Sequence, residues 1–195
     1  MRKKYKSHKV HMKKLILGFT GEMASGKGTC AAYLKEKYNA ETFRFSTALF
    51  DVAHRMHLKD DRDTLQKIST FFRKEFGEDT LARVMFQDAK GAEAQLVVID
   101  GVRRLEDVKY LRELPEFKLV FLSAPMRTRY ERMVKRGEKA DDSTKTYPEF
   151  EADHKRESEL EITKLEAFAQ EIIDNSGTMP ELQSALDAIV KKYGE

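Results

Sequence analysis

The sequence of 195 residues has one cysteine, four prolines, ten glycines and no tryptophan. A single cysteine, Cys30, excludes a disulfide scaffold and fits a reducing compartment, so we expect a cytoplasmic protein. The few glycines and prolines exclude a fibrous or low-complexity chain. No apolar run approaches the ~20 residues of a membrane span, and no signal-peptide core follows the N-terminus. We therefore expect a globular protein with no membrane partner.

Length and composition predict one domain. Hydrophobic residues make up 41% of the chain, which is enough for a sizeable core, and charged residues make up 35%, which predicts a strongly charged surface. A monomer is the default expectation for this size.

The formal net charge of +3 comes from the N-terminus. Residues 1–14 hold seven of the 36 lysines and arginines and no acidic residue, which leaves 29 basic against 33 acidic residues in the rest. We expect residues 1–13 to be a disordered basic leader and residues 14–195 to form the domain. Binding to nucleic acid is expected only if residues 1–14 contact phosphates.

Hydrophobic patterning predicts strands that alternate with helices. Apolar runs predict strands at residues 15–19, 42–45, 96–99, 119–122 and 172–175. Helices with both ends defined are predicted at 27–38, 61–76, 105–114, 126–136 and 180–193. One further helix is predicted to follow an N-cap at Ser46 and Thr47, and another to begin at about residue 79. A long charged helix is predicted after residue 148. This alternation predicts an α/β fold of three layers, a five-stranded parallel sheet with helices on both faces.

Residues 21–29 (GEMASGKGT) match the pattern G-x-x-x-x-G-K between the first strand and the first helix, which is the context that a phosphate-binding loop requires. Glycines let successive N–H groups face a phosphate, the helix N-terminus adds its positive end, and Lys27 adds a charge. A glycine-rich turn without a ligand is the alternative, although a lysine in such a turn is costly without an anion. The predicted ATP contacts are Gly21, Met23, Ala24, Ser25, Gly26, Lys27, Gly28, Thr29 and Cys30.

Two residues are candidate Mg²⁺ ligands. Gly28 stands where such loops usually carry Ser or Thr, so we expect Thr29 to serve the phosphate or the metal. Asp100 ends an apolar strand and matches the acid that holds Mg²⁺, directly or through water, although it could instead cap the next helix. Gly101 follows it, so the glutamate that activates water in many motor ATPases is missing, which favours transfer to an acceptor over hydrolysis.

Three arginines, Arg129, Arg132 and Arg136, share one face of the predicted helix 126–136. This helix begins where the fourth strand ends, on the side of the sheet where ligands bind. Arginine clamps stabilise the charge that develops in phosphoryl transfer, whereas the alternative is a solvated basic face beside Glu131. The polar segment that follows favours a mobile lid over about 137–150.

The chain resembles the P-loop nucleoside and nucleotide monophosphate kinases, the group of adenylate kinase, deoxynucleotide monophosphate kinases and dephospho-CoA kinase. The segments that carry the resemblance are 21–29, Ser46–Thr47, 100–104 (DGVRR) and 131–136 (ERMVKR). The resemblance implies a P-loop kinase fold, ATP and Mg²⁺ as cofactors, and Arg103 or Arg104 on the acceptor phosphate. It also implies that Arg132 and Arg136 close over ATP, so the predicted catalytic residues are Lys27, Asp100, Arg132 and Arg136.

The acceptor side departs from the individual members of this group. The adenylate kinase pattern continues after Ser-Thr with Gly-Asp and an arginine, which this chain lacks. Dephospho-CoA kinases place an aspartate base near the end of the second strand, where Asp51 is only a displaced substitute. Residues 62–73 are similar to the acceptor-side helix of phage-type deoxynucleotide monophosphate kinases. The implied acceptor contacts are Ser46, Thr47, Gln66 and Arg73, and an acceptor-binding helical insertion is expected at about 47–91. For Gln66 and Arg73 the alternative is an exposed polar helix face.

We therefore expect an ATP-dependent kinase that transfers the γ-phosphoryl group to a small phosphate-bearing acceptor, with a nucleoside or deoxynucleoside monophosphate as the first candidate. The alternatives are a dephospho-CoA kinase-like enzyme, a slow P-loop ATPase or nucleotide switch without an acceptor, and a nucleic-acid-associated module.

Overall fold

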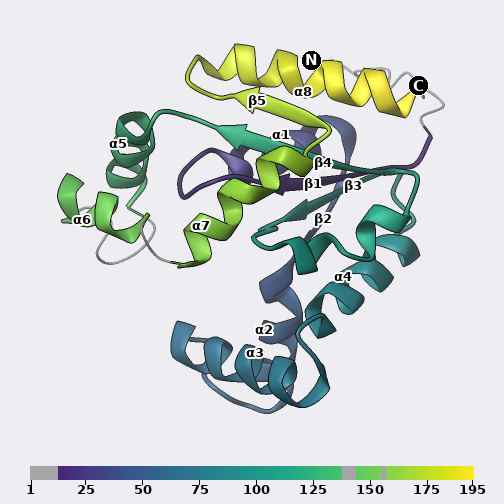
Figure 1. Cartoon of the computed structure of the whole chain (residues 1–195). Helices are drawn as coiled ribbons and strands as arrows, with labels where there is room; N and C mark the ends of the chain where they lie inside the picture. Colours follow the sequence, from purple (N-terminus) through teal and green to yellow (C-terminus); the bar gives the residue numbers. More distant parts are fainter. Residues whose placement is uncertain (1–12, 138–143, 155–156) are drawn as a thin grey trace, which may run out of the picture.

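The computed structural model describes residues 13–137, 144–154 and 157–195. It confirms the α/β fold: five parallel strands form one sheet in the order β2-β3-β1-β4-β5 (Figure 1). β1 therefore lies in the middle of the sheet and is flanked by β3 and β4. The strands are β1 (Leu15–Thr20), β2 (Glu41–Arg44), β3 (Leu96–Asp100), β4 (Phe117–Ser123) and β5 (Glu171–Asp174).

Helices connect the strands and form the two outer layers. The helices are α1 (Lys27–Tyr38), α2 (Phe45–Arg55), α3 (Arg62–Phe76), α4 (Thr80–Gly91), α5 (Met126–Arg136), α6 (Tyr147–Asp153), α7 (Glu157–Lys164) and α8 (Met179–Gly194). Short 3₁₀ helices are η1 (Leu105–Val108), η2 (Leu111–Glu113) and η3 (Leu165–Phe168). Helix ends follow local signals: Asp61 accepts a hydrogen bond from the Thr64 amide at the start of α3, and Gly137 ends α5 in the left-handed conformation.

Each face of the sheet carries its own hydrophobic core. On one face α1 and α8 cover alternate residues of the strands, with Leu34 and Leu186 fully buried there. On the other face α4 and the 3₁₀ segments pack against the strands through residues such as Met85, Val108 and Leu165. Every residue of β1 is buried, as expected for a central strand covered on both sides.

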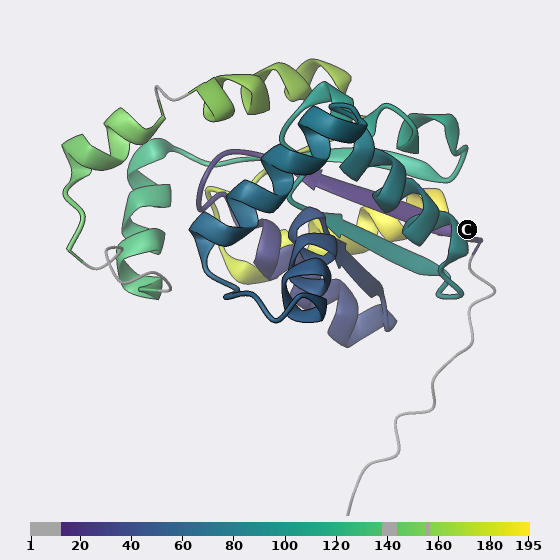
Figure 2. The same cartoon turned by 90° about the horizontal axis from the view of Figure 1, so that it is seen from below.

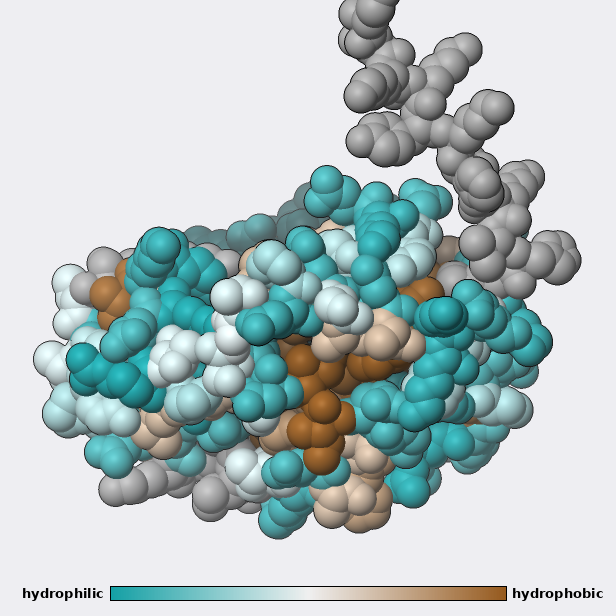
Figure 3. All heavy atoms as spheres, turned by 90° about the horizontal axis from the view of Figure 1, so that it is seen from above, coloured by the Kyte–Doolittle hydropathy of each residue, from teal (hydrophilic) through white to brown (hydrophobic). Residues whose placement is uncertain are grey.

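Seen from the α8 side, the surface is mostly hydrophilic around a small hydrophobic area (Figure 3).

Two pairs of helices extend beyond the sheet. α2 and α3 pack against each other and project away from it (Figure 1). The exposed large hydrophobic side chains of this arm are Met56, Leu58, Phe71 and Phe76. α5 and α6 lie side by side at another edge of the molecule (Figures 1 and 2), where Tyr130 of α5 packs edge-on against Tyr147 and tilted against Phe150 of α6.

Three local predictions were wrong. Ser46 and Thr47 do not precede a helix but lie in the first turn of α2, which begins at Phe45 with no side-chain cap. The predicted helix 105–114 is two 3₁₀ turns, because the buried Asp107 side chain accepts hydrogen bonds from the amides of Arg103 and Arg104 and closes a tight turn there. The predicted long charged helix is broken into α6, α7 and η3.

Two predictions fall wholly or partly outside the described residues. Of the predicted leader 1–13, the structure describes only Lys13, whose amide donates to the Gly194 carbonyl at 2.8 Å. The centre of the predicted lid, residues 138–143, is likewise not described. None of the helices in the described part of the chain is long and apolar enough to span a membrane.

Candidate active site

The loop from Gly21 to Gly26 connects the central strand β1 to α1 at the carboxyl edge of the sheet. Gly21 and Gly26 have φ angles of 138° and 110°, which L side chains rarely adopt. A Cβ atom at Gly21 would lie 2.3 Å from the Leu122 carbonyl oxygen, and one at Gly26 would lie 2.3 Å from Asn175 Nδ2. Both glycines are therefore required by the backbone conformation and by the packing of the loop against neighbouring strands.

Lys27 is the first residue of α1, and its side chain folds back against the loop. Its Nζ donates to the carbonyl oxygens of Gly21 at 2.6 Å and Glu22 at 3.0 Å. The ammonium group is thus held where the N-terminus of α1 also presents its positive end. The structure thus places Lys27 within the loop where the sequence analysis expects an anion site.

Asn175, just after β5, supports the same loop from the other side. Its Nδ2 donates to the Ser25 carbonyl at 2.8 Å, and both residues are buried. Ser25 Oγ and Thr20 Oγ1 are buried hydroxyls with no hydrogen-bond partner in the described part of the chain. Sequence reasoning placed Asn175 in a strand and missed this contact, since nothing local marks a residue that reaches a loop 150 positions away.

The three residues after Lys27 differ in their surroundings. Gly28 and Thr29 are exposed in the first turn of α1, and a Cβ atom at Gly28 would have no neighbour within 4 Å. Cys30 is fully buried, and its amide donates to the Gly26 carbonyl at 3.0 Å. Burial, with a smaller contribution from Asp100, raises the pKa of the Cys30 thiol to about 12. The structure thus places the Cys30 side chain in the core and not at the loop surface.

Asp100 ends β3, in register with Phe19 of the neighbouring β1, so its carboxylate lies beside the start of the phosphate loop. Arg44 ends β2 in register with Asp100, and its Nε lies 3.3 Å from Asp100 Oδ2. The Asp100 side chain is 16% exposed and that of Arg44 is 62% exposed. Sequence reasoning missed the position of Arg44 beside the candidate site, because this residue lies within a run predicted as strand.

The two candidate acceptor arginines after Asp100 have different environments. Arg104 is half-buried, and its Nη1 lies 3.5 Å from Glu78 Oε2 at the α3–α4 junction. Arg103 is exposed, and its amide donates to Asp107 at 2.9 Å. Arg104 therefore connects the α3–α4 junction to the segment after β3, whereas the Arg103 side chain is exposed to solvent.

The predicted acceptor contacts on α2 and α3 are dispersed. Ser46 is half-buried and Thr47 is exposed in the first turn of α2, and Gln66 is exposed on α3. Arg73 is half-buried, and its Nε is a buried atom without a hydrogen-bond partner among the described residues. Asp51 lies close enough to Asp88 of α4 to contribute to raising the pKa of that group, after the larger effect of burial. Asp51 thus faces α4.

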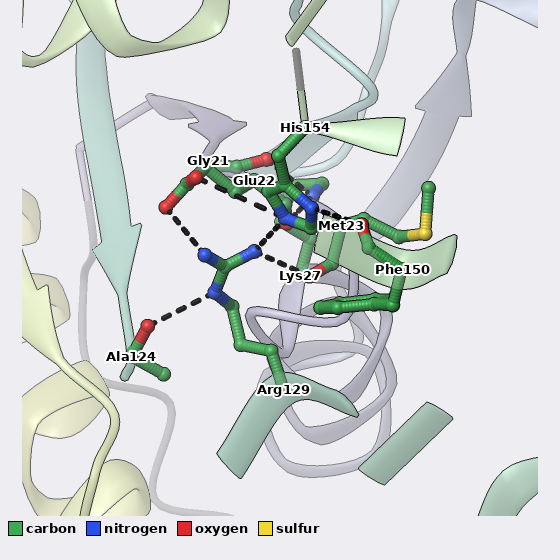
Figure 4. A network of polar contacts seen from close by, with 8 residues as sticks. All are labelled: Gly21, Glu22, Met23, Lys27, Ala124, Arg129, Phe150 and His154. Carbon is green, nitrogen blue, oxygen red and sulfur yellow. Dashed lines mark hydrogen bonds and ion pairs between the residues drawn. The ribbon is translucent and has the colours of Figure 1, made fainter. Parts of the chain in front are cut away.

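The three arginines of α5 share a face but not an environment. Arg129 is 2% exposed, Arg132 is half-buried and Arg136 is exposed. Arg132 Nη1 is buried and has no hydrogen-bond partner within the described ranges. Figure 4 shows the Arg129 guanidinium between Ala124, Glu22 and His154, with Nη2 3.0 Å from Glu22 Oε2. Arg129 is therefore a buried residue joined to the phosphate loop, and not part of a solvated basic face.

No group of three or more His, Cys, Asp or Glu residues that could hold a metal is found in the described part of the chain. A magnesium ion would instead be held by few protein oxygens together with nucleotide phosphates and water, as is usual for Mg²⁺ in phosphoryl-transfer sites. The half-buried Asp100 carboxylate beside the phosphate loop fits this requirement.

The sequence of the chain is similar to a family model and to proteins of other organisms. A family model described as an AAA domain matches residues 20–147. The UPF0200 protein of Sulfurisphaera tokodaii is 27% identical over 177 residues, which cover 91% of this chain and 96% of that protein. The UPF0200 protein of Pyrococcus abyssi is 28% identical over 183 residues, with the same two coverages. These names state no activity.

Solved structures share the fold at low sequence identity. TT1252 from Thermus thermophilus superposes with a TM-score of 0.62 at 17% identity and covers 94% of this chain and 100% of its own. Shikimate kinase from Bacteroides thetaiotaomicron superposes with a TM-score of 0.58 at 16% identity, covering 91% of this chain and 97% of its own. The fold is that of the P-loop kinases.

Proposed function

The chain belongs to the AAA domain family, whose model spans residues 20–147, and from this membership and the site geometry we propose that it is an ATP-dependent phosphotransferase acting on a small phosphate-bearing acceptor. A nucleoside or deoxynucleoside monophosphate is the first candidate for this acceptor. One observation carries the proposal. Lys27, held in the loop after β1, lies at the same edge of the sheet as Asp100 and the cationic Arg44.

The donor phosphates are assigned to the phosphate loop. Gly21 and Gly26 allow its backbone amides to turn inward, and Lys27 supplies a positive charge at the N-terminus of α1. Asp100, with Thr29 in the first turn of α1, would hold Mg²⁺. When bound, Mg²⁺ neutralises charge on the transferred phosphoryl group.

The acceptor is assigned to the side of β2 and β3. Arg103 is exposed three residues after Asp100, whereas Arg104 is paired with Glu78, so we assign the acceptor phosphate to Arg103. Arg44 lies two strands from β1, about 10 Å away at the usual strand spacing. It adds a second cation at a distance suited to an acceptor next to the donor. Arg73 on α3 is the third acceptor contact that we assign.

The chemistry needs positioning and charge neutralisation more than a strong base. The attacking oxygen of a phosphate acceptor is already anionic, so cations that offset its repulsion from the γ-phosphate are the main requirement. Arg132 of α5, with its buried unpaired Nη1 in the described part of the chain, is assigned to the charge that develops on the donor. Arg136 is assigned the same role.

An acceptor panel tests the proposal. Purified protein with Mg·ATP is incubated with each nucleoside and deoxynucleoside monophosphate, with dephospho-CoA and with shikimate, and ADP and phosphorylated product are measured together. We expect product with a nucleoside monophosphate, and a loss of several orders of magnitude in Lys27→Ala. ADP release that is independent of every acceptor would contradict the proposal and favour a slow ATPase. Product from dephospho-CoA alone would favour the dephospho-CoA kinase-like alternative.

A further inference from the structure

The Arg129 side chain joins three elements at one point. Its Nε donates to the Ala124 carbonyl at 2.9 Å after β4, and its Nη1 donates to the Met23 carbonyl at 3.3 Å in the phosphate loop. Its Nη2 lies 3.0 Å from Glu22 Oε2, and Nη1 also contacts His154 Nε2 directly after α6 (Figure 4). A single buried guanidinium thus holds the start of the phosphate loop and the end of α6 together.

The hydrogen bonds at His154 define the direction of this contact. His154 Nδ1 lies 2.7 Å from the Phe150 carbonyl, which can only accept, so Nδ1 carries the hydrogen. Nε2 then has a free lone pair and accepts from Arg129 Nη1. His154 therefore gives the end of α6 a direct hydrogen bond to the residue that holds the loop.

Glu22 makes this arrangement important for a phosphate ligand. Its carboxylate belongs to the loop that is proposed to bind phosphates, so without a partner it would repel them. Arg129 neutralises the carboxylate and turns it toward α5 (Figure 4). The Arg129 side chain is only 3% exposed, so solvent screens this pair little.

We propose that Arg129 is a positioning residue that couples the docking of α6 to nucleotide binding by the phosphate loop. The proposal rests on the proposed function for its ligand, ATP. When α6 is docked, His154 and Phe150 hold the guanidinium against Glu22 and Met23. By thermodynamic linkage, a nucleotide that binds the ordered loop stabilises the docked α6 by the same factor.

Binding of Mg·ATP to purified full-length variants tests the coupling. His154→Phe keeps a ring against Phe150 but removes the Nε2 acceptor, and it should weaken binding about tenfold, within the usual range for coupled sites. Arg129→Gln should weaken it further, because Glu22 then loses its partner as well. The double variant Arg129→Gln/Glu22→Gln should recover only the affinity of His154→Phe, because no unpaired carboxylate remains but the link to α6 is still missing. A merely structural role of Arg129 would show no such rescue.

The matched control is Glu151→Gln, an exposed position on α6, which should bind Mg·ATP like the wild type. Wild-type affinity in His154→Phe and Arg129→Gln, or a double variant no better than Arg129→Gln, would overturn the proposal. If Arg129→Gln fails to fold, His154→Phe still decides.

Hydrogen exchange separates failure of the coupling from failure of the proposed function. Without nucleotide, the amides of residues 21–26 should exchange faster in His154→Phe than in the wild type, and equal exchange would overturn the coupling. A wild-type protein that binds no Mg·ATP would instead contradict the proposed function. With Mg·ATP, exchange in residues 147–153 should slow in the wild type and much less in His154→Phe.

Discussion

Arg44 Nε lies 3.3 Å from Asp100 Oδ2, and the two residues are paired in register at the ends of β2 and β3. The partly buried carboxylate is the candidate metal ligand, and the mostly exposed guanidinium extends from it toward solvent. An anionic acceptor that approaches the phosphate loop from the β2 side would meet Arg44 first.

Replacing Arg44 should affect the acceptor more than ATP. We expect Arg44→Gln to raise the KM for the acceptor roughly tenfold, the cost of losing one charged hydrogen bond of about 1.5 kcal/mol, while the Kd for Mg·ATP changes little. Initial rates at saturating ATP measure the first value, and calorimetry measures the second. Arg112→Gln, an exposed arginine on η2, serves as the control. An unchanged acceptor KM would remove Arg44 from the site.

Gly26 and Gly28 form a natural pair for testing the loop. Gly26→Ala should lower the free energy of unfolding by at least about 1–2 kcal/mol, because φ is 110° and the new Cβ would collide with Asn175 Nδ2. It should also abolish nucleotide binding. Gly28→Ala should fold and bind normally, since its Cβ would enter open space. Denaturant titration and nucleotide binding check both variants, and equal behaviour would contradict the structure of the loop.

Asn175 should matter for both stability and nucleotide binding. Asn175→Ala leaves the buried Ser25 carbonyl without this donor, which should cost about 1–3 kcal/mol and weaken Mg·ATP binding. Urea unfolding and calorimetry measure the two effects. The exposed neighbour Ser176→Ala should change neither. A loss of stability with full affinity would show that the contact supports the fold alone.

The Cys30 thiol should be inert in the folded protein. Its pKa is about 12, raised first by burial and further by Asp100, so the reactive thiolate is scarce at pH 8 and the sulfur is shielded as well. A colorimetric thiol reagent at pH 8 should react with the urea-unfolded protein and hardly at all with the native one. Rapid reaction of the native protein would contradict the burial of Cys30.

The Asp187 carboxylate should make the free energy of unfolding decrease at acidic pH. Burial raises the pKa of its carboxyl, but hydrogen bonds from Lys37, Tyr38 and Tyr33 outweigh this effect and lower the pKa below the ordinary 3.8. A lowered folded-state pKa contributes stability above about pH 4 that is lost as the pH falls through the folded-state value. Urea titrations from pH 7 to pH 2 should show a smaller acid-induced loss in Asp187→Asn. An identical pH profile would contradict the contribution of this group.

The sequence was most informative where structure depends on neighbours in the chain. The apolar run of β1, the glycine pattern that follows it and the start of α1 at Lys27 are all local signals, and the structure confirms them. The start of α3 after Asp61 is of the same kind, because the capping side chain bonds to an amide three residues on.

The sequence was least informative where distant residues decide the outcome. The helical spacing of Arg129 and Arg132 was correct, but the burial of Arg129 depends on Met23 and Glu22, more than 100 positions away. The segment 105–114 has helical composition, yet the hydrogen bonds of Asp107 to two preceding amides give a tighter turn. Charge on Arg44 is visible in the sequence, whereas its partner on β3 is not.

The projection of α2 and α3 away from the sheet has an evolutionary consequence. These two helices pack mainly on each other, whereas α4 is the part of this connection that contributes residues to the buried core. α3 contributes no residue to either core, whereas Phe45 of α2 packs against one of them. Substitutions in α3 can therefore accumulate without disturbing the phosphate loop or the cores. On the proposed function, a single ancestral sheet acquires new acceptors by changing this helix, and exchanging residues 62–76 between relatives is a practical way to engineer the same change.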